Sequence, residues 1–176
     1  MLEGRDRPPL EGDTKSPSGQ PLPTGTITFL FTDIEGSTRL WERDPDSMHE
    51  ALVRHDDIVT AGVEQHRGML VRPRGEGDNF FSVFREAGDA IAASISIQQS
   101  LNAEPWKTQF ELKVRMAVHT GVADVRMGDY YGAAVNRSAR LRGIGHGGQV
   151  LLSSATAALV RDLSPPVPLK DMGNSH

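Results

Sequence analysis

The stretch that decides the fold is TITFLFTDIEGST, residues 26–38. Apolar side chains recur at Ile27, Phe29 and Phe31, a period of two that predicts a strand with at least one fully buried face. The strand is expected to end at Asp33, and the Gly-Ser-Thr turn that follows predicts the start of a helix. The sequence thus places a carboxylate at the end of a strand, directly before a turn.

This strand end has two interpretations. In the first, backbone N–H groups of the turn formed by Gly36, Ser37 and Thr38 point outward and bind phosphate, while the Asp33 carboxylate holds a hard cation. In the second, the same residues are only a strand followed by an Asp or Ser helix cap. The stretch by itself favours neither interpretation.

The rest of the chain predicts helices and strands in mixed order. Apolar residues at helical spacing predict two core helices, the first capped by Asp46 or Ser47 and the second ended by Pro105. The predicted elements are strand 26–33, helix 48–63, strands 69–71 and 79–84, helix 87–101, strand 109–121, helix 133–143, strand 149–152 and helix 154–161. The order predicts an α+β fold, a ferredoxin-like βαββαβ sandwich with helices on one sheet face and an additional C-terminal strand and helix.

Length and composition limit the classes of protein. A chain of 176 residues suits one domain, expected over 25–176 after a Pro-, Gly- and Ser-rich flexible leader over 1–24. The net charge of −4 gives no basic surface for nucleic acid or anionic membranes, so neither is expected as a partner. No apolar run reaches the roughly 18 residues of a membrane span, and the absence of cysteine excludes thiolate metal sites. We expect a soluble cytoplasmic protein.

Two further motifs contain residues suited to chemistry. The turn GEGD, residues 75–78, delivers Asp78 to a strand, and if this strand neighbours the first one, Asp78 and Asp33 together need a cation; the alternative is a hairpin turn with exposed acids. In DYYGAAVNRSAR, residues 129–140, Asn136 and Arg140 project from one helix face and suit a phosphoryl group that gains charge. The alternative is the solvated side of a helix.

The motifs together are more specific than any one of them. FTDIEGST (31–38), GEGDNFFSVF (75–84), VRMAVHTG (114–121), DYYGAAVNRSAR (129–140) and GGQVLLS (147–153) occur in order. In this order and spacing the chain resembles class III adenylate and guanylate cyclases over residues 26–172, most of all their short bacterial, actinobacterial-type branch. The resemblance implies the nucleotide cyclase fold.

The resemblance also implies roles for individual residues. Asp33 and Asp78 would bind two divalent ions, Mg²⁺ or Mn²⁺, with the Ile34 carbonyl as an extra ligand. Asn136 would orient the ribose and Arg140 would stabilise charge on the α-phosphate. In the family these last two come from the partner subunit, so a homodimer with shared sites is expected and a monomer should be inactive.

The residues that choose the base depart from the family pattern. Asp129 matches the family's adenine-selecting aspartate, but Arg74 stands where the family usually has lysine, and guanidinium and ammonium groups differ in shape. ATP is the expected substrate, with GTP as the alternative. By the same resemblance the C-terminal end is expected to lack the family's last strand hairpin, which implies weakened activity.

Three functions follow from the resemblance. The first is cyclisation of ATP to 3′,5′-cyclic AMP and pyrophosphate, in intracellular signalling. The alternative is a degenerate cyclase-homology module that binds nucleotide or dimerises to regulate a neighbouring domain. The third is a guanylate cyclase.

Overall fold

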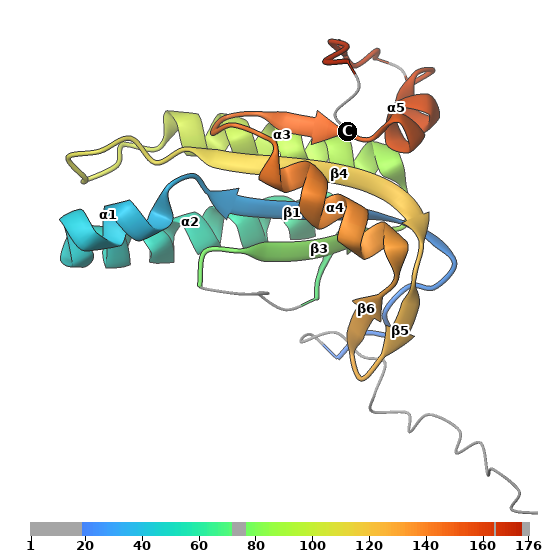
Figure 1. Ribbon diagram of the computed structural model, residues 1–176, viewed down its shortest axis with the longest axis horizontal. Coiled ribbons are helices and arrows are strands. Elements are labelled where there is room, and N and C mark those ends of the chain that lie inside the picture. Colours follow the sequence, from blue (N-terminus) through green and yellow to red (C-terminus); the bar gives the residue numbers. More distant parts are fainter. Residues whose placement is uncertain (1–18, 72–76, 164, 174–176) are drawn as a thin grey trace, which may run out of the picture.

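A computed structural model describes residues 19–71, 77–163 and 165–173 (Figure 1). Its main sheet has five strands in the order β2-β3-β1-β4-β7, and a two-stranded hairpin, β5–β6, stands beside it. The elements are β1 (Thr26–Ile34), α1 (Ser37–Arg43), α2 (Pro45–Gln65), β2 (Met69–Leu70), β3 (Phe80–Phe84), α3 (Ala87–Ala103), β4 (Val114–Val122), β5 (Asp124–Arg126), β6 (Asp129–Tyr131), α4 (Ala133–Gly143), β7 (Val150–Leu152) and α5 (Ser154–Val160). The predicted βαββαβ order and the additional C-terminal strand and helix are confirmed.

Strand β1 is the centre of the sheet. It pairs antiparallel with β3 on one side and with β4 on the other, where nine residue pairs run from Thr26↔Val122 to Ile34↔Val114. After Thr26 every residue of β1 is buried, which fits a strand covered on both faces. The end of β1, where Asp33 lies, is therefore held by neighbours on both sides.

The two faces of the sheet have separate cores. One core contains Leu30, Ile34 and apolar residues of α2 and α3. The other contains Phe29, Phe31, Tyr130 and the first turn of α4, with Phe31 stacked on Phe81 at a ring-centroid distance of 4.4 Å. The expectation that all helices lie on one face is wrong, because Ala134 and Val135 bury α4 against the opposite face from α2 and α3 (Figure 1).

Two element boundaries differ from the predicted ones. Strand β4 begins at Val114 rather than near residue 109, because β1 ends at Ile34, which pairs with Val114, and the residues before it have no strand of the sheet to pair with. Helix α2 begins earlier than predicted: Asp44 Oδ1 accepts a hydrogen bond from Ser47 N–H at 3.1 Å, with Pro45 at the first helical position. Asp46 and Ser47 are therefore not the cap.

The hairpin β5–β6 was not predicted. Its two-residue turn, Met127-Gly128, has positive φ angles of 49° and 70°, the backbone of a type I′ turn. The residues before β1 pack on the same region: Leu22 is 5% exposed, and the Tyr130 hydroxyl donates to the Pro23 carbonyl at 2.7 Å. This contact lies within the range assigned to the leader, of which residues 1–18 lie outside the described residues.

Helices α2 and α3 approach closely at Gly62, which gives a test of the packing. A Cβ at Gly62 would lie 2.3 Å from Ile97 Cγ1, whereas one at Gly88, also in a helix, would meet Leu163 at an ordinary 3.5 Å. We expect Gly62→Ala to lower the free energy of unfolding by about 1–3 kcal/mol, because the core must shift. Gly88→Ala should leave it unchanged or slightly raised. Chemical denaturation of both variants measures this, and equal stability would contradict the packing.

Candidate active site

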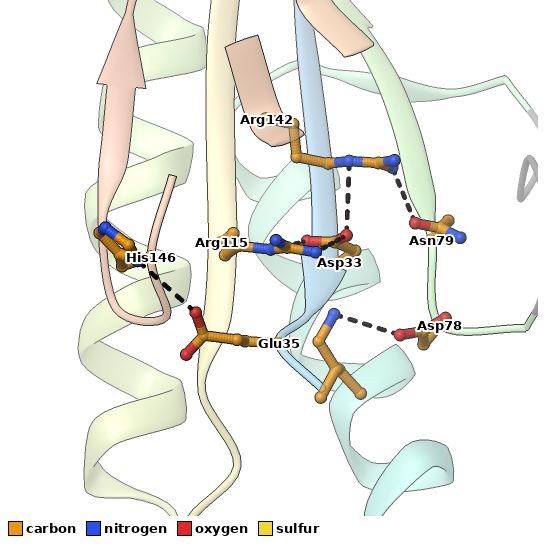
Figure 2. Close-up of polar contacts among 8 residues, drawn as sticks. Asp33, Glu35, Asp78, Asn79, Arg115, Arg142 and His146 are labelled. Carbon is orange, nitrogen blue, oxygen red and sulfur yellow. Dashed lines mark hydrogen bonds and ion pairs between the residues drawn. The ribbon is translucent and has the colours of Figure 1, made fainter. Parts of the chain in front are cut away.

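Asp33, Ile34 and Asp78 lie together at the end of β1. Because β3 neighbours β1, the turn before β3 brings Asp78 to this end of the sheet, and the Ile34 N–H donates to Asp78 Oδ2 at 3.3 Å (Figure 2). Asp33 is 7% exposed and Asp78 is 5% exposed. The condition on which the sequence argument depended, that the two strands are neighbours, is met.

Two arginines pair with the Asp33 carboxylate. Arg115, directly opposite Asp33 on β4, donates through Nε to Oδ1 at 2.8 Å and through Nη2 to Oδ2 at 2.6 Å. Arg142, from α4, places its Nε 3.5 Å from Asp33 Oδ2 and donates through Nη1 to Asn79 Oδ1 at 2.7 Å (Figure 2). The hydrogen bonds to Asp33 raise the pKa of Arg115 above its usual value. The site therefore combines two carboxylates with two guanidinium groups.

The oxygen atoms at this end of β1 suit a hard divalent cation whose remaining coordination positions are filled by the phosphates of a bound substrate. Among the described residues no group of three or more His, Cys, Asp or Glu side chains gathers to form a complete protein cage for a metal. Mg²⁺ is commonly bound by only one or two carboxylates, with substrate phosphates and water filling the other positions. Asp33, Asp78 and the backbone carbonyl of Ile34 match that pattern, and the bound ion would compete with Arg115 for Asp33.

The turn after β1 has a left-handed conformation. Gly36, with φ 69°, precedes α1, and no side chain caps the helix. Its carbonyl accepts hydrogen bonds from Arg39 and Leu40. Ser37 and Thr38 are the first two residues of α1. The backbone N–H groups in the first turn of an α-helix have no acceptor within that helix, so those of Ser37 and Thr38 can donate to a ligand. The turn lies next to the Asp33 site, as the sequence predicted.

Of the other predicted residues, Asn136 and Arg140 are on α4 and Asp129 is on β6. Asn136 and Arg140 are exposed on α4, and among the described residues neither makes a hydrogen bond or ion pair with Asp33 or Asp78. Asp129 begins β6, and its Oδ1 accepts from the Tyr130 N–H at 2.8 Å. Arg74 lies outside the described residues.

Sequence reasoning missed Arg115, Asn79 and Arg142. Arg115 occupies a polar position of the alternating strand 109–121, a position normally assigned to solvent, although a cross-strand pairing with Asp33 would have pointed to it. Arg142 lies six residues after Asn136 on an alanine-rich helix, and only the tertiary packing of α4 shows that it reaches the site. Asn79 follows Asp78 and had no distinguishing pattern.

The fold and this site define a nucleotide-cyclase catalytic domain. The sequence of residues 20–171 matches the family model of the adenylate and guanylate cyclase catalytic domain. The chain belongs to this family.

Similar proteins include an adenylate cyclase and a relative named only as uncharacterized. The chain is 39% identical over 143 residues to an uncharacterized protein of Mycobacterium tuberculosis, a match that covers 81% of the chain and 48% of that protein. It is 35% identical over 158 residues to an adenylate cyclase of Lachancea kluyveri, covering 75% of the chain and 8% of that enzyme. The chain thus spans about half the length, or less, of these curated relatives.

Solved structures agree with the family. An adenylate cyclase of Trypanosoma brucei in its monomeric state superposes with a TM-score of 0.72 at 27% identity, covering 78% of this chain and 77% of that one. An adenylate/guanylate cyclase/hydrolase of Silicibacter pomeroyi gives a TM-score of 0.74 at 25% identity, covering 85% and 87%. No helix in the described part of the chain is long and apolar enough to cross a membrane.

Proposed function

We propose that the chain converts ATP to 3′,5′-cyclic AMP and pyrophosphate, as a cytoplasmic homodimer with two shared active sites. The observation that supports this most is the meeting of Asp33, Ile34 and Asp78 at the end of the central strand, where the Ile34 N–H donates to Asp78 at 3.3 Å. Two nearly buried carboxylates beside an uncapped helix turn suit a metal-bound triphosphate.

Asp33, Asp78 and the Ile34 carbonyl would hold two Mg²⁺ or Mn²⁺ ions. When bound, such ions lower the pKa of a coordinated hydroxyl and offset the charge of the phosphates. The carboxylates would fix where the ribose 3′-oxygen and the triphosphate lie relative to each other, because Asp33 lies at the end of a strand paired on both sides and Asp78 lies two residues before its neighbour β3. The N–H groups of Gly36, the residue before α1, and of Ser37 and Thr38 in its first turn would bind phosphate oxygens.

Residues of the partner subunit would complete each site. Asn136 and Arg140 lie four apart on an exposed face of α4, which suits reaching across an interface rather than into their own subunit's Asp33 site. Asn136 would orient the ribose, and Arg140 would stabilise the negative charge that develops on the α-phosphate as pyrophosphate leaves. Asp129 would accept a hydrogen bond from the adenine amino group, with Arg74 as the second base contact.

The direct test is cyclic nucleotide formation by the purified dimer with Mn²⁺ and either ATP or GTP. We expect cyclic AMP and pyrophosphate in equal amounts, a higher kcat/KM for ATP than for GTP, and loss of product in Arg140→Ala. A higher kcat/KM for GTP would overturn the substrate assignment. No product from a folded dimer that still binds metal and ATP would favour a regulatory module that has kept the site without turnover.

A further inference from the structure

Arg142 extends from α4 to the Asp33 site of its own subunit, whereas Arg140, two residues earlier on the same helix, points to solvent. Its side chain is 22% exposed, whereas Arg140 is exposed on the outside of α4. Two residues correspond to about 200° around an α-helix, so the two side chains leave α4 on nearly opposite sides. Helix α4 therefore faces the Asp33 site of its own subunit through Arg142 (Figure 2).

The guanidinium of Arg142 has donors that its present contacts do not fully use. Its Nε is buried and makes no hydrogen bond within the described residues, and its nearest anionic oxygen is Asp33 Oδ2 at 3.5 Å. Among the residues that the structure describes, its one hydrogen bond goes from Nη1 to the neutral side-chain oxygen of Asn79. A buried N–H without a partner is costly, which indicates that the group has another ligand during function.

Asp33 does not need Arg142 for charge balance. Arg115 already donates to both of its oxygens, at 2.8 and 2.6 Å. Arg142, whose Nε lies 3.5 Å from Asp33 Oδ2, is therefore held less closely than Arg115, whose Nη2 lies 2.6 Å from the same oxygen. Guanidinium groups bind phosphate through two parallel N–H···O bonds, and this geometry is available to Arg142 once a phosphate lies beside Asp33.

We propose that Arg142 is a polyphosphate-binding residue of the Asp33 site, supplied by the same subunit as the metal-binding carboxylates. In the free protein it pairs with Asp33 and Asn79. When a metal-bound polyphosphate binds, the cation takes over Asp33 and the Arg142 guanidinium turns to phosphate oxygens. This inference rests on the proposed function only for the choice of ligand, the triphosphate of a nucleotide with its divalent ion.

The two ligands should then bind interdependently. A divalent ion alone must displace guanidinium groups from Asp33 without giving them a new anion, so its affinity is low. A polyphosphate supplies that anion, and it should raise the affinity for the metal by the same factor by which the metal raises the affinity for it. Arg142 should thus lower the affinity for the metal ion alone and raise the affinity for the metal ion together with polyphosphate.

The test measures binding without turnover, by titration calorimetry of the dimer with Mn²⁺ alone and with inorganic triphosphate at saturating Mn²⁺. In Arg142→Gln we expect about tenfold weaker triphosphate binding, or about 1.4 kcal/mol. We expect about threefold tighter binding of Mn²⁺ alone, since a partly exposed cation beside Asp33 is removed. Arg142→Lys should fall between wild type and Gln, because it keeps the charge but not the planar fork.

Arg161→Gln is the matched control, because it removes an exposed arginine at the C-terminus of α5 and should change neither affinity. Unchanged triphosphate affinity in a folded Arg142→Gln protein would overturn the proposal. So would a parallel loss of both affinities together with a lower melting temperature, the result of a purely structural role. Failure of wild type to bind Mn²⁺-triphosphate would also overturn it.

The outcome is separable from that of the proposed function. Opposite shifts in the two affinities, in a wild-type protein that forms no cyclic nucleotide, would support Arg142 as a polyphosphate ligand and refute cyclisation. Cyclic AMP formation by a wild-type dimer whose Arg142→Gln variant binds triphosphate normally would refute only the role of Arg142.

Discussion

Replacing Asp33 with Asn is expected to reduce cyclic AMP formation by about 100-fold or more, the usual effect of losing a group that stabilises charge at a reacting phosphate. The Asn side chain keeps the shape of the aspartate but loses the charge needed to hold a divalent ion. Initial rates at saturating Mn²⁺ and ATP measure the change. Asp78→Asn should behave in the same way, since Asp78 is equally buried at this end of the sheet.

The control for this variant must account for Arg115, which loses an ionic partner when Asp33 is neutralised. The melting temperature of Asp33→Asn shows whether the fold survives the change. Asp57→Asn removes an exposed carboxylate on α2 and should keep wild-type activity. Near-normal turnover in a folded Asp33→Asn protein would rule out Asp33 as an essential metal ligand.

Mixing two inactive variants should restore activity. In a heterodimer of Asp33→Ala and Arg140→Ala chains, one site has both defects, and the other has an intact Asp33 from one chain and an intact Arg140 from the other. Random reassortment makes half of the dimers mixed, so we expect about a quarter of wild-type activity. Each variant alone should show almost none, and the assay is the rate of cyclic AMP formation after joint refolding or co-expression.

The decisive control mixes Asp33→Ala with Asp78→Ala. Both changes damage the metal-binding half of a site, so each site of that heterodimer keeps one defect and activity should stay absent. Rescue in this control, or its absence in verified Asp33→Ala and Arg140→Ala heterodimers, would contradict a site shared between subunits in the proposed way.

The main sheet was predictable because its signals are local. The recurrence of Ile27, Phe29 and Phe31 at every second position and the helical spacing of apolar residues in α2 and α3 follow directly from which side chains face the core. The start of β4 was not predictable, because it depends on where β1 stops, and β1 is far away in sequence. The hairpin β5–β6 was missed because Met127 is an unusual residue at positive φ, so its turn lacks the usual Asn-Gly or Asp-Gly pattern.

The site was predictable to the extent that strand ends determine it. Asp33 and Asp78 follow from their positions beside neighbouring strands, and their meeting is a consequence of sheet order. Arg115 and Arg142 were not found, because a guanidinium on a long side chain reaches its partner through tertiary packing that no local pattern records. The metal, nucleotide and partner-subunit roles remain predictions, to be tested by the experiments above.

The contact between Tyr130 and Pro23 has a practical consequence for shortening the chain. Leu22 packs in one cluster with Phe29, Phe81 and Tyr130, and the Pro23 carbonyl accepts a hydrogen bond from the buried Tyr130 hydroxyl. A protein trimmed to the first residue of β1 would lose the Leu22 side chain from this cluster and the hydrogen bond between the Tyr130 hydroxyl and the Pro23 carbonyl. A shortened protein for crystallisation or fusion should therefore begin before Gln20, so that Leu22 and Pro23 keep their contacts with this aromatic cluster.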